Sequence, residues 1–355
     1  MSVAEDPAAG HAHAHEAAGF ARFEDAPPSP LRRLQRLLHR YPTIIPFVVL
    51  AIGLAAFSTI VGSRFFAAFN LTLIMQQVTI VALIGIAQTL VILTAGVDLS
   101  VGAIMILATI TMGHLAVSAG WPAPLAFAVG LGTGLGCGLV NGALVTLIRL
   151  PPFIVTLGTW SVFGALFLYF SGSQTIRAQE VAAAAPFLQW PGTAFQFGGA
   201  RLTIGTLLTV LAAALVWYVL NRTAFGRHVY ATGDDAEAAR LAGINTRGTL
   251  LAVYALAGVI CAIGAWVLIG RVGAISPTSG GSANLDSITA TVIGGTSLFG
   301  GRGSIVGTLV GALIVGVFRN GLALAGLDAL WQEFTVGLLI IVAVALDQWI
   351  RRVSA

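Results

Sequence analysis

The chain has 355 residues, of which 57% are hydrophobic and only 9% are charged, and its formal net charge is +4. A soluble domain carries about 25% charged residues, so this composition excludes a water-soluble globular protein and indicates an integral membrane protein. The basic residues are all arginines and are scattered among loops, which argues against a nucleic-acid-binding surface.

The N-terminal tail, residues 1–41, is polar, rich in alanine and proline, and lacks the apolar core of a signal peptide. His11, His13 and His15 alternate with alanine, but no carboxylate or cysteine cluster completes a metal site around them. The stretch 31–40 predicts a basic amphipathic helix resting on anionic headgroups. We therefore expect a cytosolic, largely disordered tail with a basic amphipathic segment.

Apolar segments recur from residue 42 to residue 350 and predict an all-α, polytopic membrane helix bundle of about ten transmembrane segments. The segment 284–300 is rich in glycine and threonine, so it either spans as a broken helix or is re-entrant. The predicted spans are 42–61, 70–94, 100–118, 122–148, 152–170, 203–221, 248–270, 284–300, 303–324 and 330–350.

The distribution of arginine gives the expected orientation. If the N-terminus is cytosolic and ten spans alternate, most arginines fall on the cytosolic side, as the positive-inside rule requires. Both termini are then cytosolic. The arginines left on the outer side are Arg64, Arg177, Arg201 and Arg271.

The segment 222–247 is the most strongly charged interruption between apolar spans. An acidic N-cap, an alanine-rich body and a following glycine predict a short capped helix over 236–242. Two turns of helix are not stable alone in water, so we expect a cytosolic partner to hold this helix, with its alanines entering a groove. The residues predicted to couple to that partner are Gly233, Asp234, Asp235, Glu237, Ala238, Ala239, Arg240 and Gly243.

The largest predicted external segment is 171–201, which contains Trp190 and can form a short external helix. It is either a plain connector or a docking surface for an extracytoplasmic partner.

Glycines at four-residue spacing lie in two predicted spans and favour close helix packing in lipid. Cys137 and Cys261 fall inside apolar runs, where they are expected to be small packing residues and neither disulfide partners nor metal ligands. The glycine stripes are Gly134, Gly138 and Gly142, and Gly303, Gly307 and Gly311.

Few charges lie within the spans. Asp98 stands at a predicted helix start, where N-capping is the expected role. Arg319 lies toward the outer end of its span and is expected to snorkel to the surface, the alternative being that it lines a pathway. Glu333 enters the last span and either caps it or pairs with Arg319.

The polar residues of the spans are mostly amides and hydroxyls, with one indole, and this pattern suits a neutral polyhydroxylated solute. Any one of them more often makes an interhelical hydrogen bond. The tentative pathway residues are Gln77, Gln88, Asn141, Thr156, Thr159, Trp160 and Thr291.

The chain cannot hydrolyse ATP through a P-loop, because that motif needs a lysine and the sequence has none. Motifs of serine hydrolases and zinc proteases are also absent, so we expect no catalytic residue, no metal and no cofactor bound by this chain. An energy source then has to come from another polypeptide.

Four motifs, in matching order, resemble the permease subunits of bacterial ABC sugar importers, the group of ribose, xylose, galactose and fructose permeases. The resemblance covers about residues 40–352, and the 221–243 segment and the ending ALDQWIRRV are most similar to fructose-type permeases. The motifs are LTAGVDLSVGAIM (93–105), LPPFIVTLGTW (150–160), GDDAEAARLAGI (233–244) and VIGGTSLFGGRGSIVGTLVGALIVGV (292–317).

This resemblance implies a permease domain over 42–350, with 222–247 as the cytosolic coupling loop that contacts the ATPase. It implies a homodimer in the bacterial inner membrane, among membrane lipid, with ATP-Mg bound by a separate cytosolic ABC ATPase. It also implies a periplasmic sugar-binding protein as partner, and no nucleic acid. The remaining alternatives are an ion-coupled secondary carrier, which the scarcity of core charges disfavours, and a membrane-embedded enzyme.

Overall fold

The computed structural model of the chain describes residues 44–351, apart from 198, 199 and 281, and it leaves out the side chains of 197, 200, 346, 347 and 349–351. The tail predicted over 1–41, with its histidines and its basic segment, lies outside the described residues. The helices and strands are α2 (Ile44–Val61), η2 (Gly62–Phe66), α3 (Ala68–Leu93), α4 (Val101–Gly113), the π-helical turn η3 (His114–Ser118), α5 (Ala123–Thr146), α6 (Pro152–Ser171), α7 (Ala178–Ala184), α8 (Pro186–Gln189), η4 (Trp190–Gly192), β1 (Ala194–Phe197), β2 (Ala200–Thr203), α9 (Ile204–Arg222), α10 (Ala224–Asp234), α11 (Ala236–Leu241), α12 (Thr246–Val272), α13 (Ala283–Ile293), α14 (Ile305–Leu324) and α15 (Ala329–Arg351).

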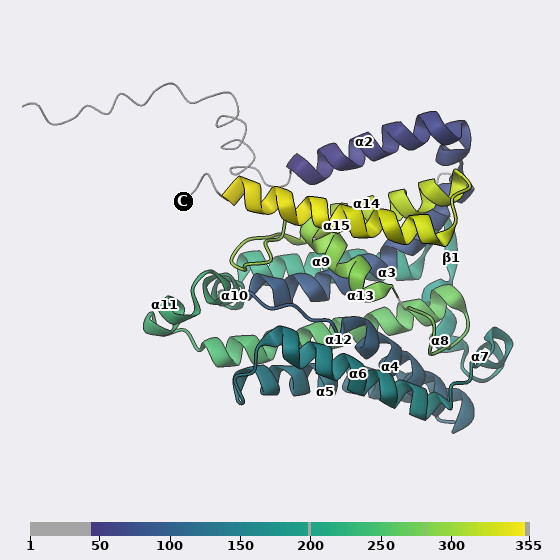
Figure 1. Ribbon diagram of the computed structural model, residues 1–355. Coiled ribbons are helices and arrows are strands. Elements are labelled where there is room, and N and C mark those ends of the chain that lie inside the picture. The colour runs from purple at the N-terminus through teal and green to yellow at the C-terminus, as the bar shows by residue number, and fades with distance from the viewer. Residues whose placement is uncertain (1–43, 198–199, 281, 352–355) are drawn as a thin grey trace, which may run out of the picture.

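The prediction of an all-α polytopic bundle is confirmed. Among the described residues, eight helices are long and apolar enough to cross a bilayer: α2 with η2, α3, α4 with η3, α5, α6, α9, α12 and α14. The other two predicted spans correspond to α15, whose apolar stretch is Ala329–Ala345, and to the short α13. The helices run roughly side by side, with α10 and α11 at one end of the bundle and α7, α8 and β1 at the other (Figure 1). We call these the α11 end and the hairpin end.

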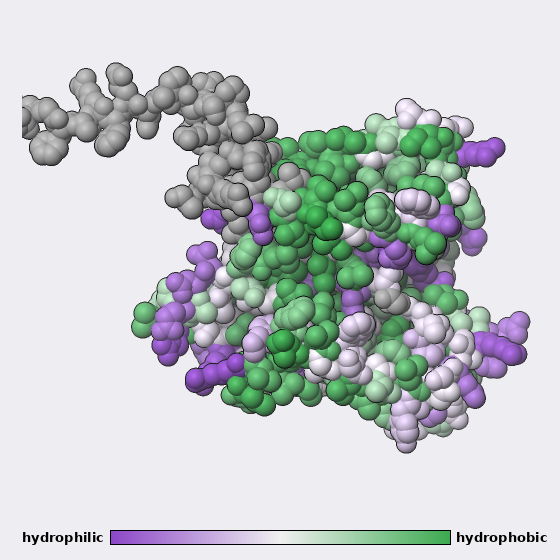
Figure 2. Space-filling view, viewed as in Figure 1, coloured by the Kyte–Doolittle hydropathy of each residue, from purple (hydrophilic) through white to green (hydrophobic). Residues whose placement is uncertain are grey.

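The surface matches a bilayer environment. In the space-filling view, hydrophobic residues cover the middle of the molecule and hydrophilic ones gather near its two ends (Figure 2). Large apolar side chains on the outer helices are exposed to the surroundings, for example Leu211 of α9 at 63%. Such side chains are stable outward only where the surroundings are lipid or another apolar surface.

Helix α12 lies at the centre of the larger apolar core, where it contacts α3, α4 and α5. Its contact with α5 is close because glycines meet backbone: Gly134 lies against the Gly258 carbonyl, and Gly138 lies against the Tyr254 carbonyl. Gly142 faces Leu251 in the same way. The first glycine stripe therefore packs helices, as predicted, and the buried free thiols of Cys137 and Cys261 belong to the same core.

A second, smaller core joins α2, η2, α3, α13 and α14. Here the second glycine stripe is used: Gly307 lies against the Gly294 carbonyl and Gly311 against the Ala290 carbonyl. Gly307 and Gly311 thus allow helices to approach to backbone contact, as predicted, whereas Gly303 lies before α14 and faces the Thr296 side chain. Helix α3 contributes to both cores, because Ile80 belongs to the larger one and Val81 to the smaller.

The segment predicted as 284–300 is a broken span. Helix α13 has 11 residues and is about 16 Å long, roughly half of a 30 Å hydrocarbon core. The chain then continues without helix to Ser304, and the Gly301 amide donates to the Leu93 carbonyl at 3.0 Å, at the α11 end. On the other side of α13, Gly280 lies against Met105 and Ile106 of α4. A helix that begins inside the bundle is tolerated where its backbone is covered by protein.

The segment predicted as the largest external one contains α7 and α8, which confirms the expected short helix. It also contains a feature that the sequence analysis did not predict, the two-stranded antiparallel hairpin β1–β2. The Arg201 amide of β2 donates to the Thr72 hydroxyl of α3 at 2.9 Å, so the hairpin is attached to the hairpin end of the bundle.

Candidate functional site

The charged segment at the α11 end forms two helices, whereas the sequence predicted one. The predicted helix is present as α11, and the Asp235 carboxylate caps it by accepting from the Glu237 and Ala238 amides at 2.9 Å each. Gly243 follows with φ of +87°, the left-handed stop expected after such a helix. The unpredicted helix is α10, capped by the Thr223 hydroxyl, which accepts from the Gly226 amide at 3.3 Å.

The outer surface of α11 is exposed, with one apolar residue at its tip. Leu241 is 79% exposed, although it lies beyond the apolar spans and the lipid they face. Ala239, by contrast, is only 5% exposed and packs inward. The Glu237–Arg240 ion pair spans 2.6 Å between two mostly exposed side chains, so it adds little stability. An exposed leucine on a short, capped helix outside the membrane fits a protein partner.

Helix α10 connects this surface to the spans. Gly233 lies against the Leu93 carbonyl at the end of α3 and against the Gly301 amide, so a side chain there would collide with backbone. The Tyr230 hydroxyl donates to the Gly303 carbonyl at 3.0 Å, and burial raises the pKa of this phenol. Helix α10, which precedes α11, is thus in direct contact with both α3 and the connection that follows α13.

Three of the tentative pathway residues converge on the turn between α3 and α4. With the Gln88 amide oriented so that both of its ends are paired, it donates to the Asp98 carbonyl at 2.9 Å and accepts from the Asp98 amide at 3.2 Å. Asn141 donates to the Ser100 hydroxyl at 2.8 Å, and Thr156 donates to the Val97 carbonyl at 3.0 Å. These side chains hold a buried turn in place.

The other tentative pathway residues differ in surroundings. Thr159 and Thr291 donate to backbone carbonyls, Thr159 to Thr156 at 3.4 Å and Thr291 to Ser287 at 2.8 Å. Trp160 is 47% exposed on the outer surface of α6. Gln77 lines a cavity of about 380 Å³ between α3, α4, α12, α13 and α14. The structure thus brings together Gln88, Asn141 and Thr156 and places Gln77 elsewhere.

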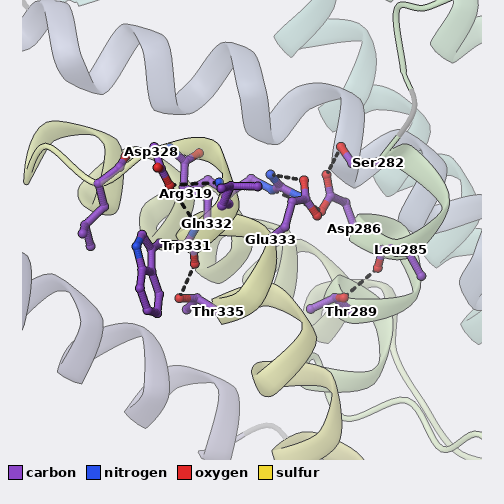
Figure 3. Close-up of polar contacts among 12 residues, drawn as sticks. Ser282, Leu285, Asp286, Thr289, Arg319, Asp328, Trp331, Gln332, Glu333 and Thr335 are labelled. Atoms are coloured by element: carbon purple, nitrogen blue, oxygen red, sulfur yellow. Dashed lines mark hydrogen bonds and ion pairs between the residues drawn. The ribbon is translucent and has the colours of Figure 1, made fainter.

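An ion-pair network centred on the buried pair Arg319 and Asp286 lies beside that cavity (Figure 3). The Arg319 Nη2 atom lies 2.7 Å from Asp286 Oδ1, and its Nη1 atom lies 3.0 Å from Glu333 Oε1. The Ser282 hydroxyl donates to the second Asp286 oxygen at 3.0 Å. The network joins α13, α14 and α15.

The expectation that Arg319 snorkels is wrong, because its residue is 8% exposed and its charge is paired inside the bundle. The expected pairing with Glu333 is confirmed. Asp286 is the functional candidate that was not predicted from sequence, although it is the one charged residue of the segment 284–300. Asp98 is also buried, and its carboxylate accepts from the Ser100 amide at 2.7 Å within the turn before α4. The expected N-capping role of Asp98 is not found, because Ser100 is the N-cap residue of α4 and no side chain caps that helix.

Two further observations limit the chemistry. No group of three or more histidine, cysteine, aspartate or glutamate side chains that could hold a metal ion occurs among residues 44–351 where they are described. Among the described residues, the core contains two buried carboxylates, Asp98 and Asp286. It therefore contains more charged groups than expected from the sequence.

Comparison with known proteins defines the class. A family model described as the permease component of the branched-chain amino acid transport system matches residues 70–344. The chain belongs to this family of permease components and is a multi-pass membrane protein.

The individual relatives are sugar permeases. The chain is 55% identical to the fructose import permease protein FrcC of Rhizobium meliloti, over 94% of this chain and 93% of the relative. It is 38% identical to the ribose import permease protein RbsC of Bacillus subtilis, over 85% of this chain and 92% of the relative. Identity to the D-allose transport system permease protein AlsC of Escherichia coli is 32%, over 86% and 91%. The resemblance to sugar-importer permeases is confirmed, and no solved structure matches the chain.

Proposed function

We propose that this chain is the membrane permease subunit of an ATP-driven importer that passes a monosaccharide, fructose or a similar sugar, into the cytosol. The relatives named for fructose, ribose and allose support the substrate class. The observation that carries the mechanism is the exposed α10–α11 surface, tied by Gly233 to α3 and to the broken span.

The partners follow from what the chain lacks. Without a lysine it has no P-loop, so ATP-Mg is bound and hydrolysed by a separate ABC ATPase that docks on α11. A periplasmic binding protein delivers the sugar at the hairpin end, where α7, α8 and β1–β2 offer a docking surface. Two copies of the chain form the pathway as a homodimer.

The orientation in the inner membrane follows from charge. Five arginines lie at the α11 end, in the α5–α6 connection, in α10 and α11, or in the adjoining ends of α9 and α12: Arg149, Arg222, Arg227, Arg240 and Arg247. The arginines at the hairpin end are Arg64, Arg177, Arg201 and Arg271. By the positive-inside rule the α11 end is cytosolic, and so are both termini.

An ion-coupled secondary carrier is the competing reading, and the buried Asp98 and Asp286 carboxylates are the features that favour it. Against it, Asp286 is neutralised by Arg319 at 2.7 Å, which leaves no free carboxylate there for an ion to bind. Asp98 in turn accepts two hydrogen bonds from Ser100, one from its amide and one from its hydroxyl, in the turn before α4.

Leu241 provides the test. Proteoliposomes containing the permease, its ATPase and its binding protein should accumulate labelled D-fructose only with ATP-Mg present. Leu241→Asp should weaken ATPase binding at least about tenfold, a loss of about 1.4 kcal/mol, because a charge replaces the apolar tip. ATPase co-purification and uptake are measured together.

Leu330 offers a matched control, since it is 78% exposed but lies at the start of α15, at the opposite end of the bundle. Leu330→Asp should leave ATPase binding unchanged. Full ATPase binding by Leu241→Asp, or uphill uptake driven by an ion gradient without ATPase, would contradict the proposed function.

A further inference from the structure

The cavity beside Arg319 is lined by polar groups that the protein itself does not pair. The side-chain amides of Gln76 and Gln77 and the guanidinium of Arg271 all line it. None of the three makes a hydrogen bond or ion pair with another described residue. Other amides of the core are used internally: Asn320 donates to Asn70 at 2.9 Å, and Gln88 pairs with the Asp98 backbone. Gln76 and Gln77 are only partly exposed, and unpaired polar groups at membrane depth are costly, so these two amides have a hydrated or ligand-filled space as their partner. Arg271 is exposed and belongs to the last turn of α12, at the hairpin end.

The cavity extends from the hairpin end into the bundle. Gln77 is nine residues from the first residue of α3, which places it about 14 Å from the hairpin end of that helix. The start of α13 lines the same cavity with Ala283 and Asp286. The cavity therefore sits where the broken span begins, on the hairpin-end side of α13.

The charges around the cavity balance. Arg271 and Arg319 are the cations, and Asp286 and Glu333 are the anions that face them in the network or across the space. Arg319 is already neutralised by two carboxylates. A charged ligand would upset this balance in a medium where charges are poorly screened, whereas a neutral, hydroxyl-rich ligand would not.

We propose that this cavity is a sugar-binding site within the permease, in which Gln76, Gln77 and Arg271 hydrogen-bond to the hydroxyls of one monosaccharide. The inference rests on the proposed function and extends it, because it assigns the permease its own contact with the sugar. A volume of about 380 Å³ lies in the range of about 300–1,000 Å³ usual for small-molecule sites. Amides and a guanidinium offer both donors and acceptors to a polyol, and the fixed Asp286–Arg319–Glu333 network forms one wall.

The test uses cysteine protection. Gln77→Cys is reconstituted with the ATPase but without the binding protein, and its rate of labelling by a membrane-impermeant methanethiosulfonate is measured. D-fructose at 100 mM should slow labelling at least threefold, and potassium chloride of equal osmolality should not. The native thiols Cys137 and Cys261 are buried, so the unsubstituted protein gives the blank. Gln76→Cys is the second variant if Gln77→Cys does not assemble.

Gln179→Cys on α7 is the matched control, because Gln179 is exposed and lies outside the cavity. Its labelling should be insensitive to D-fructose. Equal protection of Gln179→Cys, protection by potassium chloride, or no protection of either cavity variant by D-fructose or D-ribose would overturn the site. ATP-dependent uptake by the unsubstituted complex is measured in parallel. If uptake is normal but D-fructose gives no protection, the cavity proposal fails while the proposed function stands.

Discussion

Arg319 keeps its charge inside the bundle because carboxylates from two other helices reach it. Asp286 is on α13 and Glu333 is on α15, so the three side chains fix the relative positions of three helices. Asp286 is buried, whereas Glu333 is about half exposed. Water therefore screens the charge interaction of Arg319 with Glu333 more than its interaction with Asp286.

We predict that Asp286→Leu and Arg319→Met each lower the melting temperature of the detergent-purified protein. Removing one partner of a buried pair costs about 3–5 kcal/mol in soluble proteins, because the remaining charge has no partner. The double variant should melt above both single variants, since replacing a whole buried pair by apolar residues is often neutral. A double variant that is less stable than either single variant would contradict this explanation, because the loss of stability would then not come from an unpaired buried charge.

Residue-level roles were the part of the site that sequence could not predict. Gln77 and Gln88 are both on α3, eleven residues apart, and eleven residues are close to three full turns, so the two amides share one face. Their roles differ only because the turn at Asp98 folds back against Gln88, while Gln77 meets a cavity. That difference comes from segments outside α3, so no pattern within this helix predicts it.

At the scale of elements, the contact between α5 and α12 depends on which face of α5 each glycine occupies. A Cβ atom on Gly138 would collide with the Tyr254 carbonyl, whereas a Cβ atom on Gly136 would meet nothing within 4 Å.

This difference gives a matched pair of variants. Gly138→Ala should push α12 away and lower the yield and melting temperature of the folded permease. Gly136→Ala should be neutral or slightly stabilising, because alanine is favoured over glycine inside a helix by about 0.5–1 kcal/mol. The melting temperatures of both variants are measured by thermal unfolding in detergent. Equal changes in the two would show that the glycine stripe is not needed for close packing of α5 against α12.

The elements predicted most accurately were the long spans, because a bilayer imposes a length and a composition that are visible in sequence. Helix α11 was predicted from its cap and its stop. Helix α10 was missed because its stretch contains Gly226 and Gly233, which weaken a helix, and is only moderately apolar. Those glycines are present for a reason that lies elsewhere in the fold: Gly233 must touch the Leu93 and Gly301 backbones.

For the whole molecule, the orientation is open to a direct test. Gln179 and Asp235 are both exposed and lie at opposite ends of the bundle, so they report on the two sides of the membrane without disturbing the core. A reporter enzyme that is active only outside the cytosol should give signal when fused at Gln179 and none at Asp235. Signal at Asp235 would reverse the assignment of the α11 end, and with it the place of the ATPase.

The two apolar cores described above have a mechanical consequence for the cavity. Its walls come from both, since Ile80, Met105 and Leu268 belong to the larger core and Val81 to the smaller. The cavity therefore lies where the two cores meet, next to helix α3, which belongs to both. Ile80 and Val81 are consecutive residues of that helix, so the two cores are held at a fixed spacing beside the cavity. A change in the packing of either core along α3 should therefore also change the space that is left for a solute.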